Sequence, residues 1–201
     1  MTEVLDRGLQ QKIESLRADL REMQSAALAF SGGADSALLA FLAQQELGEN
    51  FLAVTLRSAL MQDGDLADVA RFCKEHNIAH AFLDMDILNN EAFAANCSDR
   101  CYHCKVAIFS AVKECADARH LKQVMDGTNV EDCPKRRPGM RVLSEKGIRS
   151  PLRENNFSKE EVRRASQAFG LFTWDKGSDS CLATRLEQGE RITAEKLRKL
   201  R

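Results

Sequence analysis

The sequence predicts an α/β fold in which a doubly wound parallel sheet carries helices on both faces. Two observations support this fold class. Short apolar runs of strand length alternate with longer segments of helical periodicity, and a glycine-rich turn follows the first apolar run. Parallel strands need helical crossovers, and these crossovers cover both faces of the sheet.

The first predicted helix is amphipathic and ends near Gln24. Its apolar residues recur at intervals of three and four: Leu5, Leu9, Ile13, Leu16, Leu20 and Met23. A short strand at 26–30 then enters a Ser-Gly-Gly turn, and a helix at 36–47 ends at Gly48. A second strand at 51–56, a helix at 65–77 and a third strand at 81–85 continue the alternation.

A helix at 105–118 and a fourth strand at 123–125 extend the same pattern into the second half of the chain. The segment 134–150 is rich in Arg, Pro and Gly and lacks a clean period, so we expect a long loop over the nucleotide-binding end of the sheet. Ser158 and Glu161 have the spacing of a capping box and open a helix that Gly170 stops. Cys181 is expected in the loop after this helix.

Bulk composition excludes several classes of protein. The net charge of −1 gives no long-range field for a polyanion, so we expect a small substrate and no nucleic acid. The first thirty residues lack the features of a secretory signal, and no apolar run is long enough to cross a bilayer, so we expect a cytoplasmic protein without membrane contact. In that compartment the 7 cysteines are expected as core residues, metal ligands or reactive thiols.

The glycine-rich turn is expected to bind the pyrophosphate end of ATP. It reads Ser31-Gly32-Gly33-Ala34-Asp35-Ser36. Glycines permit positive φ angles and close backbone approach to an anion, and the N-terminus of the following helix adds its dipole. The turn is neither the Gly-Lys-Ser/Thr loop of kinases and GTPases nor the Gly-x-Gly-x-x-Gly of dinucleotide folds. A tight turn without a ligand is the alternative interpretation.

The second candidate site is a cysteine cluster. Cys101 and Cys104 are spaced so that both thiolates can reach one metal, and Cys97 and Cys181 could complete the ligand set. Taken alone, this spacing is compatible with zinc, an iron–sulfur cluster, a redox pair or no ligand. The three cysteines from 97 to 104 also have the spacing of radical-SAM enzymes, but that motif normally follows the first strand of a barrel.

The turn at 31–36 resembles the PP-loop of the N-type ATP pyrophosphatases, which cleave ATP between the α- and β-phosphates. Over nearly its whole length the chain resembles the LarE family within that superfamily. The matching segments are Asp99-Arg100-Cys101-Tyr102-His103-Cys104-Lys105, Asp126-Gly127-Thr128-Asn129, Arg137-Pro138-Gly139, Ser150-Pro151-Leu152, Lys159 with Val162-Arg163, and Cys181-Leu182-Ala183-Thr184-Arg185 followed by Gly189 and Ile192-Thr193.

The resemblance implies an ATP-dependent sulfur transferase of nickel-pincer nucleotide cofactor synthesis. LarE proteins adenylate the carboxylates of a pyridinium biscarboxylic acid mononucleotide and replace the activated oxygen by sulfur. In one branch a cysteine at the position of Cys181 gives up its sulfur and becomes dehydroalanine. In another, three cysteines hold a [4Fe-4S] cluster, and the presence of Cys101 and Cys104 favours this branch, with Cys181 as the third ligand.

The resemblance also gives the expected organisation and partners. It implies a PP-loop ATP pyrophosphatase domain over 1–157 and a helical C-terminal segment over 158–201 that carries Cys181, with the family's further C-terminal domain absent. It implies a homo-oligomer, a small carboxylated nucleotide as substrate and sulfide or another sulfur donor. ATP, Mg²⁺ and a [4Fe-4S] cluster are the expected cofactors. A PP-loop tRNA thiolase and a non-catalytic nucleotide-binding protein with a zinc-stapled loop are the alternatives.

Two residues are expected to be catalytic. Cys181 would deliver or hold the sulfur, and Asp35 would lie near Mg²⁺ or the pyrophosphate. Cys101, Cys104 and Cys181 are the expected metal ligands. The expected nucleotide contacts are Ser31, Gly32, Gly33, Asp35, Ser36, Lys105, Asp126, Gly127, Arg137 and Arg185. For Asp126, a cap of the loop that follows it is the alternative interpretation.

Overall fold

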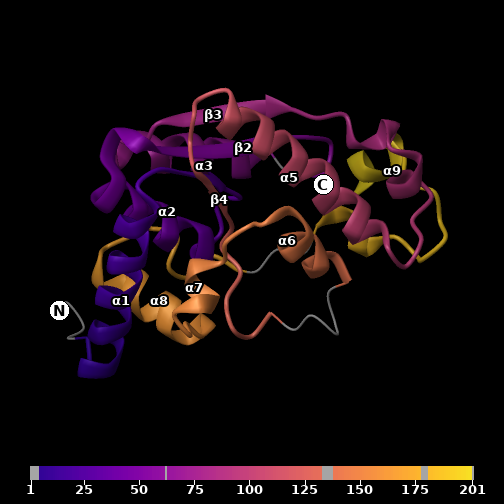
Figure 1. Cartoon of the computed structure of the whole chain (residues 1–201). Coiled ribbons are helices and arrows are strands. Elements are labelled where there is room, and N and C mark those ends of the chain that lie inside the picture. The colour runs from indigo at the N-terminus through magenta and orange to yellow at the C-terminus, as the bar shows by residue number, and fades with distance from the viewer. Residues whose placement is uncertain (1–4, 62, 133–137, 178–180, 201) are drawn as a thin grey trace.

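A parallel four-stranded sheet forms the centre of the molecule (Figure 1). The structure is a computed structural model of the chain and describes residues 5–61, 63–132, 138–177 and 181–200. The strands are β1 (Ala26–Ala29), β2 (Phe51–Arg57), β3 (His80–Asp84) and β4 (Gln123–Met125). Their spatial order is β3-β2-β1-β4, and every neighbouring pair is parallel.

The strand order reverses beside β1. The chain moves outward from β1 through β2 to β3 and then returns to the other side of β1 as β4. In open α/β sheets ligands bind at the carboxyl ends of the strands at such a reversal. The turn at 31–33 and the segment that begins at Asp126 both leave the sheet at this point.

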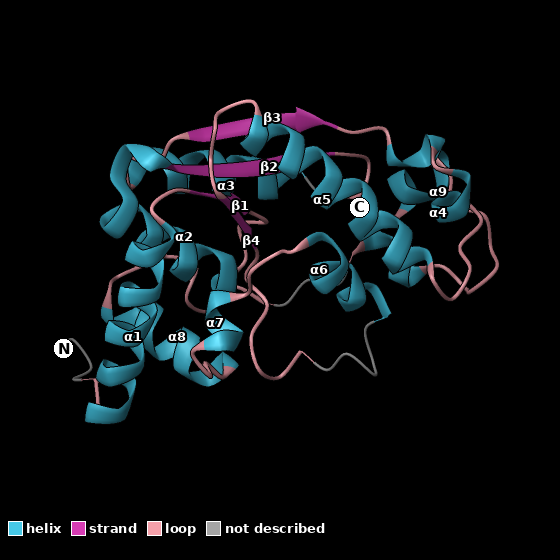
Figure 2. Ribbon diagram, in the orientation of Figure 1, coloured by secondary structure: helices cyan, strands magenta, loops and turns pink. Residues whose placement is uncertain are grey.

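Helices cover both faces of the sheet (Figure 2), which confirms the doubly wound arrangement. Alternate residues of a strand point to opposite faces, and accordingly Ala26 and Leu28 belong to one core cluster and Ala27 to the other. The first cluster includes residues of five helices: α1 (Arg7–Met23), α2 (Ala34–Leu47), α3 (Asp63–Glu75), α7 (Pro151–Glu154) and α8 (Lys159–Ala168). The second includes residues of α5 (Arg100–Asp117) and α6 (Arg141–Lys146).

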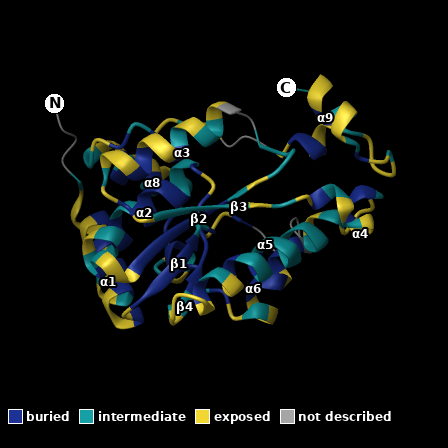
Figure 3. Ribbon diagram, turned by 90° about the horizontal axis from the view of Figure 1, so that it is seen from above, coloured by how far each residue is buried: buried dark blue, intermediate teal, exposed yellow. Residues whose placement is uncertain are grey.

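A small third cluster lies at one end of the molecule, away from the N-terminus (Figure 3). It joins α4 (Glu91–Ala94), the 3-10 helix η4 (Leu182–Arg185) and α9 (Ala194–Lys199) through buried residues such as Phe93, Leu182 and Leu197. The remaining short 3-10 helices are η1 (Gly48–Asn50), η2 (Ile87–Asn89) and η3 (Pro138–Met140). None of the described helices has the length and apolar character that crossing a bilayer requires.

Local signals in the sequence explain several helix ends. Asp6 accepts a hydrogen bond from the Leu9 amide and caps α1, whose buried stripe agrees with the predicted apolar residues from Leu9 to Met23. Ser158 and Glu161 form the predicted capping box of α8. The boundary between two domains at residue 157 stays a prediction, although α8 packs with α2 in the first core cluster.

Two predictions about the second half were wrong. The segment 134–150 is not one long loop, because it contains η3 and the helix α6. The helix α6 has only six residues, too few for a periodic signal; it buries Val142 and Leu143 and ends at Gly147 with φ 66°. In addition, α5 begins at Arg100 and not at 105, so Cys101 and Cys104 lie in its first turns and not in a loop.

Candidate active site

The turn after β1 places several hydrogen-bond donors at the N-terminus of α2. The hydroxyl oxygens of Ser31 and Ser36 lie 3.1 Å apart, and the Ser36 hydroxyl donates to the Gly33 carbonyl at 3.1 Å. Gly33 is the N-cap residue of α2 and provides no side-chain cap. The first amide N–H groups of this 14-residue helix are therefore left for another acceptor, as an anion-binding helix N-terminus requires.

Two glycines allow the backbone to pack closely around this turn. Gly32 has φ +77°, and a Cβ atom there would lie 2.6 Å from Cγ2 of Val69 on α3. A Cβ atom on Gly127 would lie 2.9 Å from the Ser36 amide nitrogen. The loop after β4 therefore lies directly on the N-terminus of α2, and the predicted nucleotide residues Gly32 and Gly127 shape the site through close packing.

Asp35 lies in the first turn of α2, close to charged side chains from two other segments. Its carboxylate accepts a hydrogen bond of 3.0 Å from the Asn129 amide nitrogen. Burial raises the pKa of Asp35, and the nearby Asp132 carboxylate acts in the same direction. The hydrogen bond from Asn129 and the positive charges of Lys159 and Arg163 act in the opposite direction. Two carboxylates and two cations thus face one another beside the turn.

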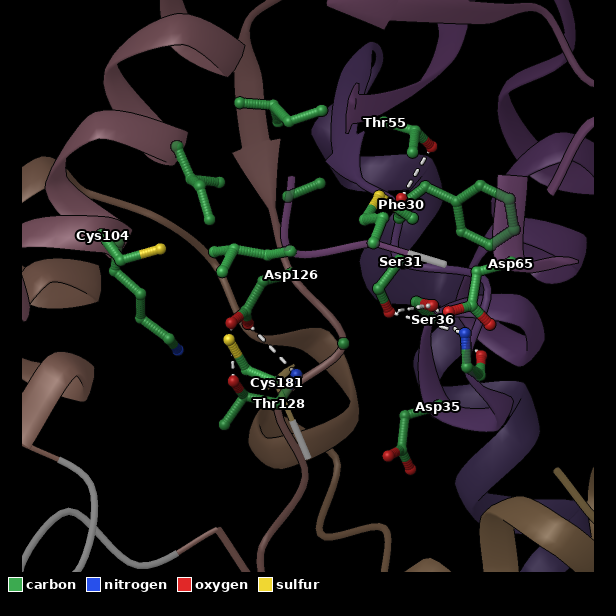
Figure 4. A pocket seen from close by; sticks show the side chains of 18 of the residues that line it. Phe30, Ser31, Asp35, Ser36, Thr55, Asp65, Cys104, Asp126, Thr128 and Cys181 are labelled. Carbon is green, nitrogen blue, oxygen red and sulfur yellow. Dashed lines mark hydrogen bonds between the residues drawn. The ribbon is translucent and has the colours of Figure 1, made fainter. Parts of the chain in front are cut away.

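One cavity of about 570 Å³ connects these groups (Figure 4). Ser31, Gly33, Asp35 and Ser36 line one part of it, together with Lys159 and Arg163. Apolar side chains line another part: Ala29, Val54, Leu56, Met85, Ile87, Ile108 and Phe109. Its size is that of pockets for small molecules, and its walls combine an anion-binding end with a surface suited to a flat aromatic base.

Asp126 lines the cavity, but neighbouring groups occupy its carboxylate. Asp126 accepts two hydrogen bonds from Thr128 (Figure 4), one from its backbone amide at 3.2 Å and one from its hydroxyl at 2.6 Å. The oxygen that accepts from the Thr128 amide also accepts from the Ser150 hydroxyl at 2.7 Å. The residue is 7% exposed. In this arrangement Asp126 holds the loop after β4 in place, which supports its interpretation as a cap of that loop.

Replacing Asp126 by alanine is expected to lower the free energy of unfolding by about 3 kcal/mol, because three buried donors lose a charged acceptor. Urea denaturation measures this loss. Asp86→Ala is the matched control, since Asp86 also accepts from the amide two residues ahead, Leu88, but is exposed. Equal losses in the two variants would contradict the anchoring role of Asp126.

The three cationic residues predicted to contact the nucleotide do not all lie at the cavity. Lys105 lines the cavity, with its ammonium 5.9 Å from the centre of the Phe109 ring. Arg137 lies outside the described residues. Arg185 is exposed, donates a hydrogen bond of 2.9 Å to the Leu200 carbonyl and does not line the described cavity. Its predicted nucleotide contact is therefore not part of the described site.

Two of the four candidate cysteines line the cavity, and a third lies near enough to both to affect their pKa values. Cys104 and Cys181 line it (Figure 4). Burial raises the pKa of Cys104 to about 12, and the charges of Cys181 and Cys101 contribute to the rise. Desolvation also raises the pKa of Cys181, a rise to which Cys101 adds, while a hydrogen bond from the Ala183 amide opposes it. Cys97 is exposed and contributes to neither shift.

The thiol set has the chemistry of an iron–sulfur or zinc site, because thiolates are the ligands that both prefer. Cys101 and Cys104 lie on one helix, and Cys181 is the N-cap residue of η4. Within the described ranges, however, no group of three or more His, Cys, Asp or Glu side chains already has the arrangement of a metal site. Binding of a metal or cluster would therefore require these thiols to move closer together.

Several charged residues of the cavity were not assigned to the site from the sequence. Lys159 and Arg163 lie four residues apart on α8, so they share one helix face. Lys176 is a third cation of the wall; it pairs with Asp65 at 3.0 Å and with Asp68 at 2.9 Å. The spacing of Lys159 and Arg163 was visible in the sequence, but the approach of α8 to the turn after β1 was not.

Comparisons with known proteins agree with this geometry. The family model described as NAD synthase matches residues 4–122, more than half of the chain. The uncharacterised protein slr1717 of Synechocystis sp. (strain PCC 6803) is 38% identical over 192 residues, covering 96% of this chain and 72% of that protein. The pyridinium-3,5-bisthiocarboxylic acid mononucleotide synthase of Lactiplantibacillus plantarum, a LarE protein, is 31% identical, with coverages of 90% and 66%.

A solved structure shows the same fold. The NH3-dependent NAD synthetase of Campylobacter jejuni superposes with a TM-score of 0.66 at 19% sequence identity, covering 90% of this chain and 82% of that one. The fold is therefore the α/β fold of the PP-loop proteins. Together with the family model and the two sequence relatives, the turn at 31–36 and the thiols around the same cavity show that the chain belongs to the LarE family of PP-loop ATP pyrophosphatases.

Proposed function

We propose that this chain is an ATP-dependent sulfur transferase that acts on the carboxylate of a small nucleotide. The observation that carries the proposal is the single cavity lined both by the PP-loop and by the thiols of Cys104 and Cys181. An activated carboxylate and a sulfur atom can meet in such a space. The name of the L. plantarum relative, which describes a thiocarboxylic acid of a mononucleotide, supports a product of this class.

In the first step the cavity binds ATP and the substrate carboxylate. The pyrophosphate end lies against the amide groups at the N-terminus of α2 and the hydroxyls of Ser31 and Ser36. Asp35 and Asp132 both line the cavity and would be the carboxylates that hold Mg²⁺, a hard cation that prefers oxygen ligands. The substrate carboxylate attacks the α-phosphorus, pyrophosphate leaves, and Lys159 and Arg163 stabilise its charge.

In the second step sulfur replaces the activated oxygen. A sulfur nucleophile attacks the carbonyl carbon of the acyl-adenylate, and AMP leaves with the oxygen. A [4Fe-4S] cluster held by Cys101, Cys104 and Cys181 would supply sulfide. Without a cluster, the Cys181 sulfur attacks after its thiol has lost a proton to a base, which gives a thioester. A base then removes the Cα proton of Cys181, and cleavage of the Cβ–Sγ bond leaves the thiocarboxylate and dehydroalanine. Both versions need Cys181 at the cavity wall, where the chain places it.

The products of ATP test the proposal. In the presence of a pyridinium biscarboxylic acid mononucleotide, the protein is expected to release AMP and pyrophosphate, measured by chromatography of the nucleotides and an enzyme-coupled pyrophosphate assay. Asp35→Ala and Ser36→Ala are expected to abolish this release. Release of ADP and orthophosphate without AMP would overturn the proposal, because the PP-loop serves cleavage between the α- and β-phosphates.

A further inference from the structure

A buried asparagine joins the two segments that carry the thiols. Asn96 precedes the helix of Cys101 and Cys104 and is 0% exposed. Its side-chain nitrogen donates to the Glu187 carbonyl at 2.8 Å and to the Glu190 carbonyl at 2.9 Å. Its backbone carbonyl accepts from the Gly189 amide at 2.9 Å. Three bonds therefore connect Asn96 to the segment that follows Cys181 and η4.

The same side chain also holds a positive charge near the thiols. The Asn96 side-chain oxygen accepts a hydrogen bond from the Arg100 guanidinium. Arg100 lies in the first turn of α5, and its charge acts on both Cys104 and Cys181. Both hydrogens and the oxygen of the Asn96 amide are thus in use. The orientation of the amide is fixed chemically, since carbonyls can only accept and a guanidinium can only donate.

The backbone at this position favours asparagine further. Asn96 has φ 57°, in the left-handed region where asparagine and glycine are tolerated best. No other side chain of similar size supplies two donors and an acceptor in that conformation. Asn96 therefore meets a conformational requirement and a hydrogen-bonding requirement at once.

We infer that Asn96 is a positioning residue that assembles the thiol set, by fastening the Cys181 segment to the first turn of α5 and holding Arg100 beside it. The inference rests on the proposed use of Cys181 in sulfur transfer. Cys101 and Cys104 share a helix and stay together without Asn96. Cys181 lies on another segment, so contacts between the two segments must bring it to the pair. The bonds of the buried Asn96 side chain are among these contacts.

Cadmium binding by the full chain tests the inference without sulfur transfer. Cd²⁺ is a soft ion that prefers thiolates, and its thiolate charge-transfer absorption reports how many sulfurs bind. The wild-type protein, anaerobic and reduced, is expected to bind one Cd²⁺ through three thiolates. Cys181→Ser is expected to reduce this to two. Asn96→Asp is expected to do the same and to weaken Cd²⁺ affinity at least about tenfold, because a carboxylate cannot donate to the two carbonyls while Arg100 keeps its acceptor.

A second variant and a matched control complete the experiment. Asn96→Gly keeps the left-handed backbone and introduces no buried charge, so it tests the same side-chain bonds if Asn96→Asp unfolds. Arg191→Ala removes the ion pair between Arg191 and Glu91, which joins the same two segments at the surface, and is expected to bind Cd²⁺ like the wild type. A purely structural role of Asn96 would lower the melting temperature and leave the thiolate count of the folded protein at three.

Two results would overturn the inference. One is a folded Asn96→Gly protein that binds Cd²⁺ through three thiolates with wild-type affinity. The other is identical Cd²⁺ binding by the wild-type and Cys181→Ser proteins, because the thiol set would then not include Cys181. Either result leaves the release of AMP and pyrophosphate as an independent test of the proposed function, because the PP-loop lies in another part of the cavity.

Discussion

Cys181→Ala is expected to abolish sulfur transfer completely while the protein still forms AMP and pyrophosphate from ATP. The thiol lies in the cavity wall together with the PP-loop, but it is not part of the turn that binds the phosphates. Loss of the sulfur-bearing group should therefore stop the second step and spare the first. Measuring thiocarboxylate by mass spectrometry and pyrophosphate in the same samples separates the two steps.

The other cysteines distinguish the two sources of sulfur. If a cluster supplies it, Cys101→Ala and Cys104→Ala should lose transfer, iron and the brown colour of the anaerobic protein, because each removes a thiolate ligand. If Cys181 supplies it, only Cys181 is indispensable, and the protein loses the mass of one hydrogen sulfide molecule in a single turnover. Cys97→Ala is the control, since Cys97, unlike Cys101, adds nothing to the pKa shifts of Cys104 and Cys181. A Cys181→Ala protein that still turns over repeatedly would contradict both versions.

Lys159→Ala and Arg163→Ala are each expected to lower kcat/KM for adenylation by about 10²- to 10³-fold, the usual effect of removing one group that stabilises charge in a transition state. Both side chains line the cavity and act on Asp35, and no ion pair among the described residues engages either of them. Negative charge develops on pyrophosphate as it leaves, so two such cations beside the PP-loop should accelerate that step. Rates of pyrophosphate release with saturating and limiting ATP measure the effect.

Arg164→Ala is the matched control for these two variants. Arg164 lies on the same helix but pairs with Asp6 at 3.0 Å on another face, and it does not line the described cavity. We expect its adenylation rate to stay within about twofold of the wild type, since surface ion pairs contribute little. If all three variants behaved alike, the cations of α8 would have no specific role in the reaction.

The part of the site that could be predicted from sequence is the part built by contiguous residues. The turn at 31–36 carries its own geometry, because Gly32 needs a positive φ angle and α2 follows directly. Ser158 and Glu161 likewise specify their capping box locally. The cysteine pair lies on α5, whereas the sequence predicted that this helix begins only at 105, since the helical start at Arg100 has no side-chain cap to mark it.

The rest of the site depends on contacts between distant segments. The bond between Asn129 and Asp35 joins residues 94 positions apart, and Lys159 and Arg163 lie still further along the chain. The periodicity of apolar residues in the sequence does not show which distant segments lie close together in the fold. The role of Asp126 was also open, because only the position of Ser150 shows that neighbouring hydroxyls occupy its carboxylate. Arg185 had a plausible motif position but points to the Leu200 carbonyl.

The bonds of Asn96 reach residues 91 and 94 positions away, and this separation bears on the order in which the protein matures. During synthesis Cys101 and Cys104 leave the ribosome long before Cys181, and closing so large a loop has an entropic cost that only late contacts offset. For that interval the nascent chain exposes a pair of thiols without its third partner. We therefore expect any metal or cluster to be inserted after translation. We also expect Cys101 and Cys104 to be most easily oxidised before Cys181 joins them.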